Sequence, residues 1–155
     1  MEKMIVFSLN QELYALSVLV VKEIVKSTEL NPIPGSQDYF EGVMNLRGSV
    51  VPVINLEKRF NLQVEHTAEK QHIIILDIDG TLFGMLVDDV SEVLNVAPET
   101  IQPVSETLAK KIDVTLLTGI VLDKERIILC LNANKLFTNM HEETVQKPED
   151  IQQNI

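Results

Sequence analysis

The chain has 155 residues, 45% of them hydrophobic and 23% charged, which fits one ordinary domain or two very small ones and argues against extensive disorder. Its 13 Lys and Arg against 23 Asp and Glu give a net charge of −10, which argues against binding nucleic acid and against docking on anionic lipid. One cysteine excludes a disulfide framework, and the lack of a signal peptide or an apolar membrane span favours a soluble cytoplasmic protein.

Short apolar runs rich in Val and Ile predict a fold that is mainly all-β. In chain order, the expected strands cover residues 4–9, 13–20, 42–46, 49–56, 72–78, 82–87, 119–122 and 126–132. Turn sequences separate several of them, among them Leu46-Arg47-Gly48-Ser49 and Asp79-Gly80. We also expect a long loop over 104–118 with room for a short helix, a helix opening at Asn134–Phe137, and a flexible polar tail over 139–155.

An internal repeat is the most informative pattern in the chain. A shift of 69 residues places Ile5 over Ile74, and a shift of 77 residues later in the chain places Gly42 over Gly119. The two collinear repeat blocks cover about 4–60 and 73–137. They predict a duplication into two similar small β-modules. Because units of that size are only marginally stable alone, we expect the modules to pack on a shared hydrophobic core.

One stretch suggests an enzyme. The run from Ile73 to Leu82, which contains Asp77 and Asp79, resembles the first motif of the haloacid dehalogenase-like phosphatases. In that family the first aspartate attacks phosphorus and the second acts as a general acid or base beside magnesium. A magnesium-dependent phosphatase is therefore one alternative. The context disfavours it, because the residues that follow predict another strand across an Asp-Gly turn and not a βα unit.

No other catalytic or metal-binding set is present in the sequence. The three histidines are isolated, Cys130 lies in an apolar run without basic neighbours, and the glycines form no phosphate-binding loop. Two features favour binding: Arg47 at the tip of an apolar hairpin, and the apolar surplus of segment Val18–Val25. We expect Val18 and Val21 to lie in the core, and Val20, Ile24 and Val25 are open to an exposed docking surface.

Several stretches together resemble CheW, the adaptor family of bacterial chemotaxis arrays. The centre of the resemblance is Glu41-Gly42-Val43-Met44-Asn45-Leu46-Arg47-Gly48, followed by Pro52-Val53. The resemblance also includes Tyr14–Val18, Val21–Val25 and Phe83–Leu94, and it covers roughly residues 4–137. Asn55 departs from the family pattern, in which aspartate is usual, but the change is conservative.

The resemblance implies a fold, a function and a set of partners. Family members consist of two five-stranded SH3-like β-barrels packed against each other, so residues 1–138 are expected to form one CheW-like domain with short helices. Such proteins have no catalytic activity and use no cofactor. They bridge the cytoplasmic tip of chemoreceptors (methyl-accepting chemotaxis proteins) to the regulatory domain of the histidine kinase CheA, and they join other CheW copies in membrane-associated arrays. A detached CheA-type regulatory module, which shares the fold, is the second alternative.

The same resemblance assigns roles to particular residues. Arg47 matches the arginine involved in receptor coupling, and Glu23 matches the glutamate that pairs with it, beside an apolar groove between the barrels. The expected receptor-binding residues are Glu23, Ile24, Val25, Asn45, Leu46, Arg47 and Gly48. The expected kinase-facing part is the second barrel, around 66–122, and the candidate kinase contacts are Val21, Val87 and Val90.

Overall fold

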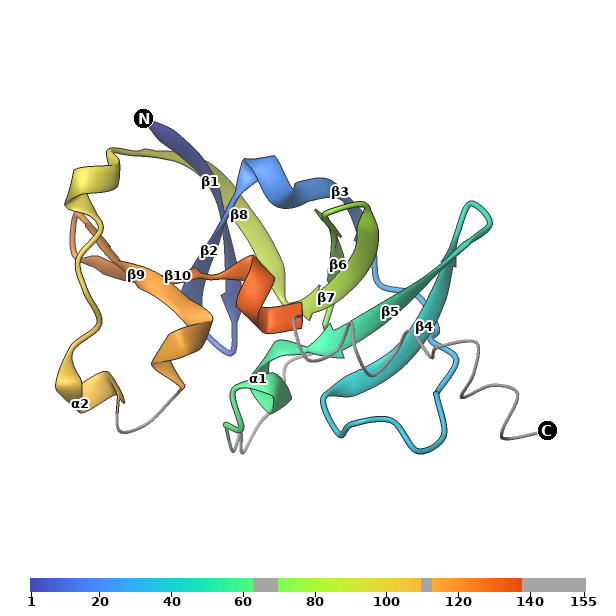
Figure 1. The fold of residues 1–155 in the computed structure, drawn as a ribbon. Helices are drawn as coiled ribbons and strands as arrows, with labels where there is room; N and C mark the ends of the chain where they lie inside the picture. Colours follow the sequence, from blue (N-terminus) through green and yellow to red (C-terminus); the bar gives the residue numbers. More distant parts are fainter. Residues whose placement is uncertain (63–69, 110–112, 138–155) are drawn as a thin grey trace.

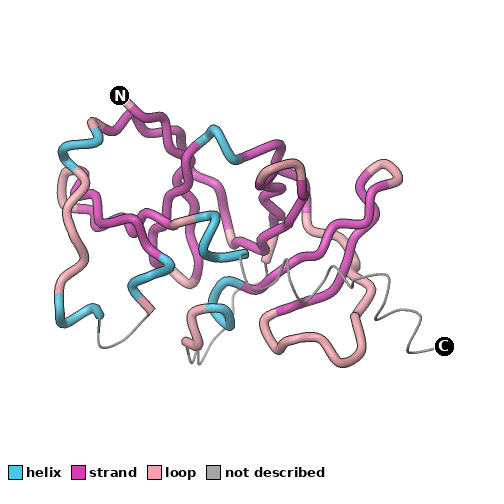
Figure 2. Tube along the Cα trace, in the orientation of Figure 1, coloured by secondary structure: helices cyan, strands magenta, loops and turns pink. Residues whose placement is uncertain are grey.

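The computed structural model of the chain describes residues 1–62, 70–109 and 113–137, and these fold mainly into strands (Figure 1). The strands cover Glu2–Leu9 (β1), Glu12–Ser17 (β2), Val21–Lys26 (β3), Phe40–Leu46 (β4), Ser49–Asn55 (β5), His72–Ile78 (β6), Thr81–Val87 (β7), Asp89–Val96 (β8), Leu117–Asp123 (β9) and Arg126–Leu131 (β10). The helices are short (Figure 2). Five lie between strands, and they cover Val18–Val20 (η1), Leu56–Arg59 (α1), Pro98–Thr100 (η2), Glu106–Ala109 (α2) and Val114–Leu116 (η3), and one more, over residues 133–137, follows β10. The predicted tail over 139–155 lies outside the described residues.

The strands form two five-stranded sheets. Sheet A has the order β8-β1-β2-β10-β9, and sheet B has the order β3-β6-β7-β5-β4. Neighbouring strands are antiparallel except for β2 with β10 and β5 with β7, which are parallel. Figure 1 shows the two sheets side by side, each curled on itself. This arrangement confirms the predicted fold, which is mainly β and consists of two SH3-like barrels.

The internal repeat is present in the topology, but it does not divide the chain into two separate barrels. Exchanging β1 to β5 with β6 to β10 converts the strand order of sheet A into that of sheet B. Sheet A therefore takes β1 and β2 from the first repeat block and three strands from the second, and sheet B does the reverse. The prediction that the blocks 4–60 and 73–137 each form one barrel is wrong. A repeat reveals which segments are alike, but it does not reveal which strands they pair with.

Two strands, β3 and β8, are not predicted by the sequence, and they occupy equivalent positions in the two repeats. Each strand alternates between exposed and half-buried residues and follows its predecessor without a Gly or Pro turn. They are the strands at which the chain changes sheet, since β2 leads through η1 into β3 and β7 leads through Asp88 into β8. The strand expected over 13–20 therefore ends at Ser17, and the loop expected over 104–118 contains α2 and η3.

Tight turns connect the hairpins and use residues with positive φ, as such turns require. Arg47 and Gly48 have φ values of 48° and 90°, and Asp79 and Gly80 have values of 52° and 87°. Asp77 Oδ1 accepts a hydrogen bond from Gly80 N at 2.8 Å, and β7 then pairs antiparallel with β6. The two aspartates of the phosphatase alternative therefore belong to a hairpin, and the element after them is a strand where such an enzyme needs a βα unit.

Three clusters of buried side chains hold the fold together. The largest lies between the sheets and takes residues from both, for example Phe7 and Leu16 from sheet A and Leu76 and Phe83 from sheet B. Two smaller clusters lie within sheet A and within sheet B. Burial of apolar surface is the main favourable term in folding. The predicted shared core is therefore present, and it joins two barrels whose own cores are small.

Two glycines occupy equivalent positions where a loop crosses close to an edge strand. Gly42 in β4 and Gly119 in β9 have φ values of 140° and 159°, in the region that side chains rarely adopt. A Cβ atom on Gly42 would lie 2.5 Å from the carbonyl oxygen of Asn31, and one on Gly119 would lie 2.5 Å from a methyl carbon of Ile101. Glycine is therefore required at both positions, for backbone conformation and for space.

Candidate protein-binding site

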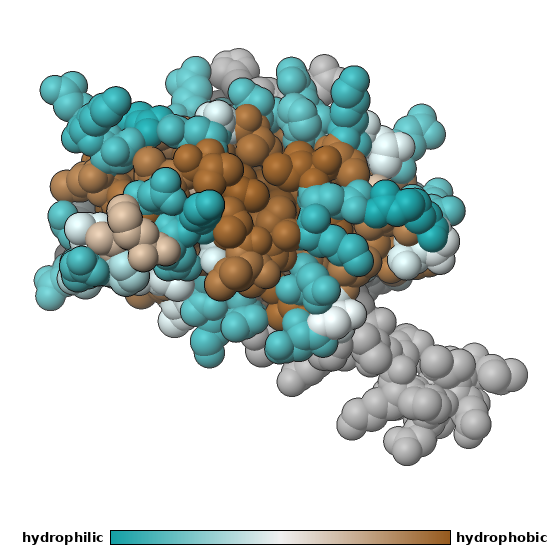
Figure 3. Space-filling view, turned by 90° about the horizontal axis from the view of Figure 1, so that it is seen from above, coloured by the Kyte–Doolittle hydropathy of each residue, from teal (hydrophilic) through white to brown (hydrophobic). Residues whose placement is uncertain are grey.

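The crossing from sheet A to sheet B at η1 is apolar and exposed. Its start is fixed by Ser17, whose side-chain oxygen accepts a hydrogen bond from Leu19 N at 3.3 Å. None of the three residues of η1 is buried, and Leu19 is 89% exposed. η1 lies at the top of Figure 1, and Figure 3, which views that face, shows a continuous apolar surface across its middle with hydrophilic side chains around it. An apolar surface of this kind commonly marks a site for a protein partner.

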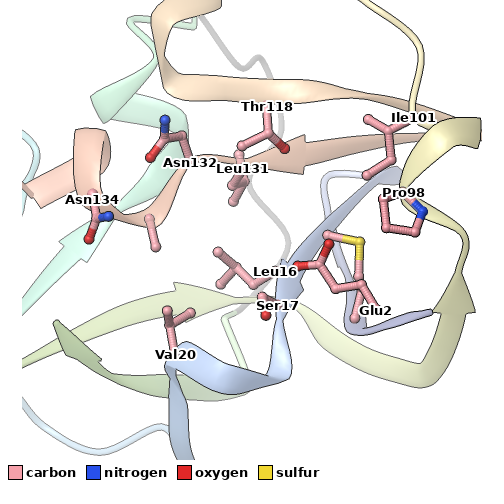
Figure 4. Close-up of a pocket in the computed structure, with 12 residues that line it drawn as sticks. Glu2, Leu16, Ser17, Val20, Pro98, Ile101, Thr118, Leu131, Asn132 and Asn134 are labelled. Carbon is pink, nitrogen blue, oxygen red and sulfur yellow. The ribbon is translucent and has the colours of Figure 1, made fainter.

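A cavity of about 430 Å³ opens beside η1 (Figure 4). Leu16, Ser17 and Val20 line one side of it, and Leu131 and Asn134 line the opposite side, at and beyond the end of β10. The walls mix apolar side chains with polar ones, among them Glu2, Thr118 and Asn132, so the cavity offers both kinds of contact. Side chains of a protein that covers η1 could therefore enter this cavity.

An ion pair joins the two edges of sheet B. The edge strands of that sheet are β3 and β4, and Arg47 Nη2, in the turn after β4, donates a hydrogen bond to Glu23 Oε2 of β3. Asn45 fixes the turn, because its Oδ1 accepts a hydrogen bond from Gly48 N at 2.8 Å. The hydrogen bond from Arg47 lowers the pKa of the Glu23 carboxyl below its ordinary value, and the positive charge of Arg47 adds to this effect. The predicted Glu23–Arg47 pair is thus present, and its glutamate lies three residues after the end of η1.

A second ion cluster joins the edges of sheet A at the equivalent place. Glu92 of β8 occupies the repeat position of Glu23, and its Oε1 lies 2.6 Å from Arg126 Nη1. Arg126 Nη2 also lies 2.5 Å from Asp123 Oδ2. Arg126 stands at the start of β10, whereas Arg47 stands within its turn. The same closure is therefore made in both sheets from arginines at different positions.

The other predicted receptor-binding residues differ in exposure. Ile24 is 39% exposed, and Asn45 and Gly48 are exposed in and next to the turn. Val25 is half-buried against the core of sheet B, and Leu46 is buried within that core. Leu46 therefore supports the hairpin from inside, and its prediction as a direct contact is wrong, because its side chain faces the interior of the barrel.

The predicted kinase contacts belong largely to the core. Val87 is fully buried, so its prediction as a direct contact is wrong, and the reason is that β7 is a central strand covered on both faces at this end. Val21 and Val90, which are equivalent in the repeat, are half-buried against the shared core and expose only part of their side chains. The stretch around 66–122 contributes strands to both sheets, so it is not a barrel of its own.

Sequence patterns do not single out several of the most exposed apolar side chains. Besides Leu19, these include Val50 of β5 at 71%, Ile127 of β10 at 59% and Leu122 of β9 at 54%. Leu122 and Ile127 are directly opposite each other in the β9–β10 pair, and together they form what we call the sheet A patch. The sequence signal for the sheet A patch is the alternation of inward and outward side chains along a strand, which places Leu122 and Ile127 on the outer face.

These features together define a class: a protein-binding domain built from two interleaved β-barrels, with an open apolar crossing between them. Comparison with known proteins agrees with that class. The CheW-like domain family matches residues 3–141. The chain therefore belongs to the CheW-like family, whose members are scaffold proteins of chemotaxis. Within the described residues, no helix is long and apolar enough to span a membrane.

Individual relatives support the family assignment over most of the chain. The chemotaxis protein CheW of Bacillus subtilis is 38% identical over 133 residues, which cover 86% of this chain and 85% of the relative. The chemotaxis protein CheW of Treponema pallidum is 32% identical over 142 residues, which cover 88% and 82%. A crystal structure of the scaffolding protein TtCheW from Thermoanaerobacter tengcongensis matches with a TM-score of 0.79 and 35% identity, and the match covers 88% of this chain and 87% of that one.

Proposed function

We propose that this chain is a non-catalytic adaptor that couples chemoreceptors to the histidine kinase CheA in chemotaxis signalling. The observation that carries the proposal is the Glu23–Arg47 pair, which holds an exposed hairpin tip close to the open apolar crossing at η1. Family membership supplies the chemotaxis context. The protein acts in the cytoplasm, is recruited to membrane-associated receptor arrays through its partners, and does not itself insert into the membrane.

The receptor contact in this proposal follows η1 and the turn between β4 and β5. Leu19 and Ile24 offer apolar area to the helical tip of a receptor, and the cavity beside η1 offers room for its side chains. Arg47 lies at the rim with a planar set of donors, and its positive φ holds it in the turn, away from the strand ladder. Apolar contacts at the centre supply affinity, and a charged rim sets register and specificity.

The kinase contact in this proposal lies on the outer face of sheet A. The sheet A patch, Leu122 and Ile127, is exposed and apolar. Val90 of β8 packs against the shared core and is not part of this outer face. The regulatory domain of CheA shares the two-barrel fold according to the family resemblance, so this contact is one of barrel against barrel. Other copies of the adaptor have the same fold and compete for this type of surface.

The acidic surface contributes to encounter rates in this proposal. A net charge of −10 attracts a basic surface on a partner and repels acidic ones, which changes association rates more than final affinity. The association rate with the kinase regulatory domain is expected to fall as salt is raised from low to physiological concentration. An association rate that does not depend on ionic strength contradicts this role of the charge.

A binding experiment with two matched variants tests the proposed function. Calorimetry measures binding of the full chain to a soluble receptor-tip fragment and to the regulatory domain of CheA. We expect Leu19→Asp to weaken receptor binding by at least about tenfold and to leave kinase binding within about twofold, and Leu122→Asp to give the opposite pattern. Absence of binding to both partners contradicts the proposal, and equal losses in both variants contradict the assignment of the two surfaces.

A further inference from the structure

A buried charged cluster lies in the part of the chain that the adaptor function does not use. Glu57 of α1 is the one buried charged side chain among the described residues. Lys70 Nζ lies 2.5 Å from Glu57 Oε1 and 2.9 Å from Asp88 Oδ1. All three side chains are largely shielded from solvent, with exposures between 5% and 13%. We call these three residues the polar lock.

The polar lock connects segments of both sheets. Glu57 follows β5 and Lys70 precedes β6, so both are attached to sheet B, and Asp88 lies where the chain leaves sheet B for sheet A. Asp88 Oδ2 accepts a hydrogen bond from Asn10 N at 2.5 Å, in the β1–β2 turn of sheet A. Asp88 N donates to the carbonyl oxygen of Ser8 at 3.0 Å. A break in this cluster therefore loosens a direct connection between the sheets.

The charges of the polar lock stabilise one another. Burial lowers the pKa of the Lys70 ammonium, but its pairing with the carboxylates of Glu57 and Asp88 outweighs burial and raises that pKa above its ordinary value. Lys70 Nζ lies at ion-pair distance from both carboxylates, although the contacts do not reach hydrogen-bond geometry. Moving the sheets apart at this end would leave a buried charge unpaired, which is costly, whereas apolar contacts are non-directional. The apolar core between the sheets holds them together, and the polar lock adds a constraint on the angle between them.

The internal repeat gives the polar lock an informative counterpart. A shift of 69 residues places Leu19 at the position of Asp88, and a shift of 77 residues places Asn134 at the position of Glu57. Leu19 is the exposed residue of η1, and Asn134 lines the cavity beside it. The two ends of the interface between the sheets are thus related by the repeat: charges close one end, and the other end holds an open cavity lined by polar and apolar side chains. In Figure 1, α1 and the β1–β2 turn lie at the bottom, and η1 lies at the top.

We propose that Glu57, Lys70 and Asp88 are positioning residues: they close one of the two repeat-related ends of the sheet interface and thereby set the width of the groove at the other end. The six residues of β2 connect the two ends and span about 20 Å. If the sheets rotate by about 5° about the end that holds the polar lock, the walls of the cavity beside η1 move by roughly 2 Å over that length. Such a shift is enough to spoil packing against a rigid helical partner. This inference rests on the proposed receptor contact at η1.

Two variants and a matched control test the polar lock. Lys70→Met removes the cation but leaves two buried carboxylates unpaired, so it is expected to lower the unfolding temperature. The triple variant Glu57→Gln, Lys70→Met, Asp88→Asn removes all three charges with little change of shape and is expected to fold. The control is Lys58→Met. Lys58 Nζ of α1 lies 3.2 Å from Glu41 Oε1 of β4, so this ion pair does not involve sheet A, and it is more exposed than the polar lock. Residual dipolar couplings of the free proteins report the angle between the sheets, and calorimetry reports binding to a receptor-tip fragment.

For the triple variant, we expect the residual dipolar couplings of sheet A and sheet B to indicate an angle between the sheets that differs from the wild-type angle. We expect receptor binding to be weaker by at least about fivefold, with binding to the CheA regulatory domain within about twofold of wild type. The control is expected to match wild type in both measurements. Unchanged couplings in the triple variant overturn the inference, and so do changed couplings with unchanged receptor affinity. If the wild-type chain fails to bind the receptor fragment, the proposed function is wrong, and the couplings alone then decide whether the polar lock sets the angle.

Discussion

Sheet A and sheet B have equivalent strand orders, yet they close their edges with arginines at different positions. In sheet A, Arg126 lies at the start of β10 and contacts two carboxylates, Glu92 and Asp123, which neutralise it from both sides. In sheet B, Arg47 lies in the turn itself, is 67% exposed and has Glu23 as its partner. Sheet A shows that the closure does not require an arginine at the hairpin tip.

The difference separates what the fold needs from what function adds. In sheet A, an arginine in a strand that is paired with two carboxylates is sufficient to join the sheet edges. The duplicated sheet B could be joined by an arginine at the same place. Arg47 instead stands in the turn itself, at a φ of 48°, and its repeat equivalent in sheet A, Lys124, has a φ of 58°. The conformation is therefore common to both turns, and what differs is the arginine side chain that sheet B places there. Because exposed ion pairs contribute little to folding, the placement of this guanidinium agrees with the receptor contact proposed above.

The largest expected effect tests whether the two sheets are equivalent in energy as well as in topology. Gly42→Ala and Gly119→Ala each force a Cβ against a crossing segment and a strained φ, so each should lower the free energy of unfolding by about 2–4 kcal/mol. Urea denaturation measures the change. The control is Gly80→Ala, where φ is positive but no atom lies within 4 Å of the added Cβ, and the expected loss is about 1 kcal/mol. Losses at Gly42 and Gly119 that differ by more than about 2 kcal/mol would break the equivalence.

The next effect separates the two arginines. Arg47→Ala is expected to weaken binding of a receptor-tip fragment by about tenfold, whereas Arg126→Ala should change it by less than about twofold. Both variants should unfold close to the wild-type temperature, because the Arg47 pair is exposed and the Arg126 pairs are only partly buried. Calorimetric titration measures the affinities, and Arg47→Lys serves as a variant that keeps the charge but loses the planar donor array. Equal losses at the two arginines would remove the functional distinction between the sheets.

A smaller effect concerns the pH dependence of one buried phenol. Burial raises the pKa of Tyr14 to about 12, with further contributions from the charges of Glu12 and Glu57. In the unfolded chain tyrosine ionises near pH 10, so the unfolded state gains stability relative to the folded one as pH rises above about 10. The free energy of unfolding should thus fall by about 1 kcal/mol between pH 9 and pH 11 through this group.

The repeat supplies the control for Tyr14, since the equivalent residue in the other half is Phe83, which cannot ionise. Tyr14→Phe should remove this part of the alkaline loss of stability and leave the stability near pH 7 similar. Parallel urea titrations of the wild type and the variant at pH 9 and pH 11 measure the difference. Identical slopes with pH in the two proteins would show that Tyr14 does not carry the effect.

The smallest effect is expected at a pair of fully buried equivalent residues. Cys130 of sheet A and Val53 of sheet B have the same repeat position and the same complete burial. Cys130→Val should therefore change the free energy of unfolding by less than about 1.5 kcal/mol, because valine is the residue that sheet B has at the equivalent buried position. Burial also raises the pKa of the Cys130 thiol to about 11, so the native protein should react slowly with thiol reagents at pH 8. Rapid modification of the folded protein would place this side chain outside the core.

Much of the architecture was predictable from residue patterns, and the repeat was its clearest sign. The hairpin turns at Arg47-Gly48 and Asp79-Gly80 follow from turn chemistry, and the shared core follows from the small size of the modules. The interleaving was not predictable from one sequence. Strand pairing over long distances depends on which edges meet in space, and β3 and β8 give no turn signal where they change sheet.

The candidate site was predictable in part. The Glu23–Arg47 pair could be anticipated because both residues belong to the family resemblance, and the structure brings them together. The burial of Leu46 and Val87 does not follow from the sequence, because an apolar residue in a strand looks the same whether it faces a partner or the core. The polar lock is not predictable either, because Glu57, Lys70 and Asp88 are far apart along the chain and form no local motif.

The interleaved strands also fix the order in which the protein can be completed during synthesis. All strands of sheet B lie between Val21 and Val87, so that sheet has its full set once residue 87 has left the ribosome. The β1–β2 hairpin is made first, but it must wait for β8, β9 and β10, and the last of these ends at Leu131. Contacts of such long sequence separation slow folding, and waiting strand edges are prone to pair wrongly. The first strands to be synthesised are thus the last to be incorporated into a complete sheet. Sheet A is therefore the half of the molecule whose unpaired strand edges are exposed to wrong pairing for the longest time during synthesis.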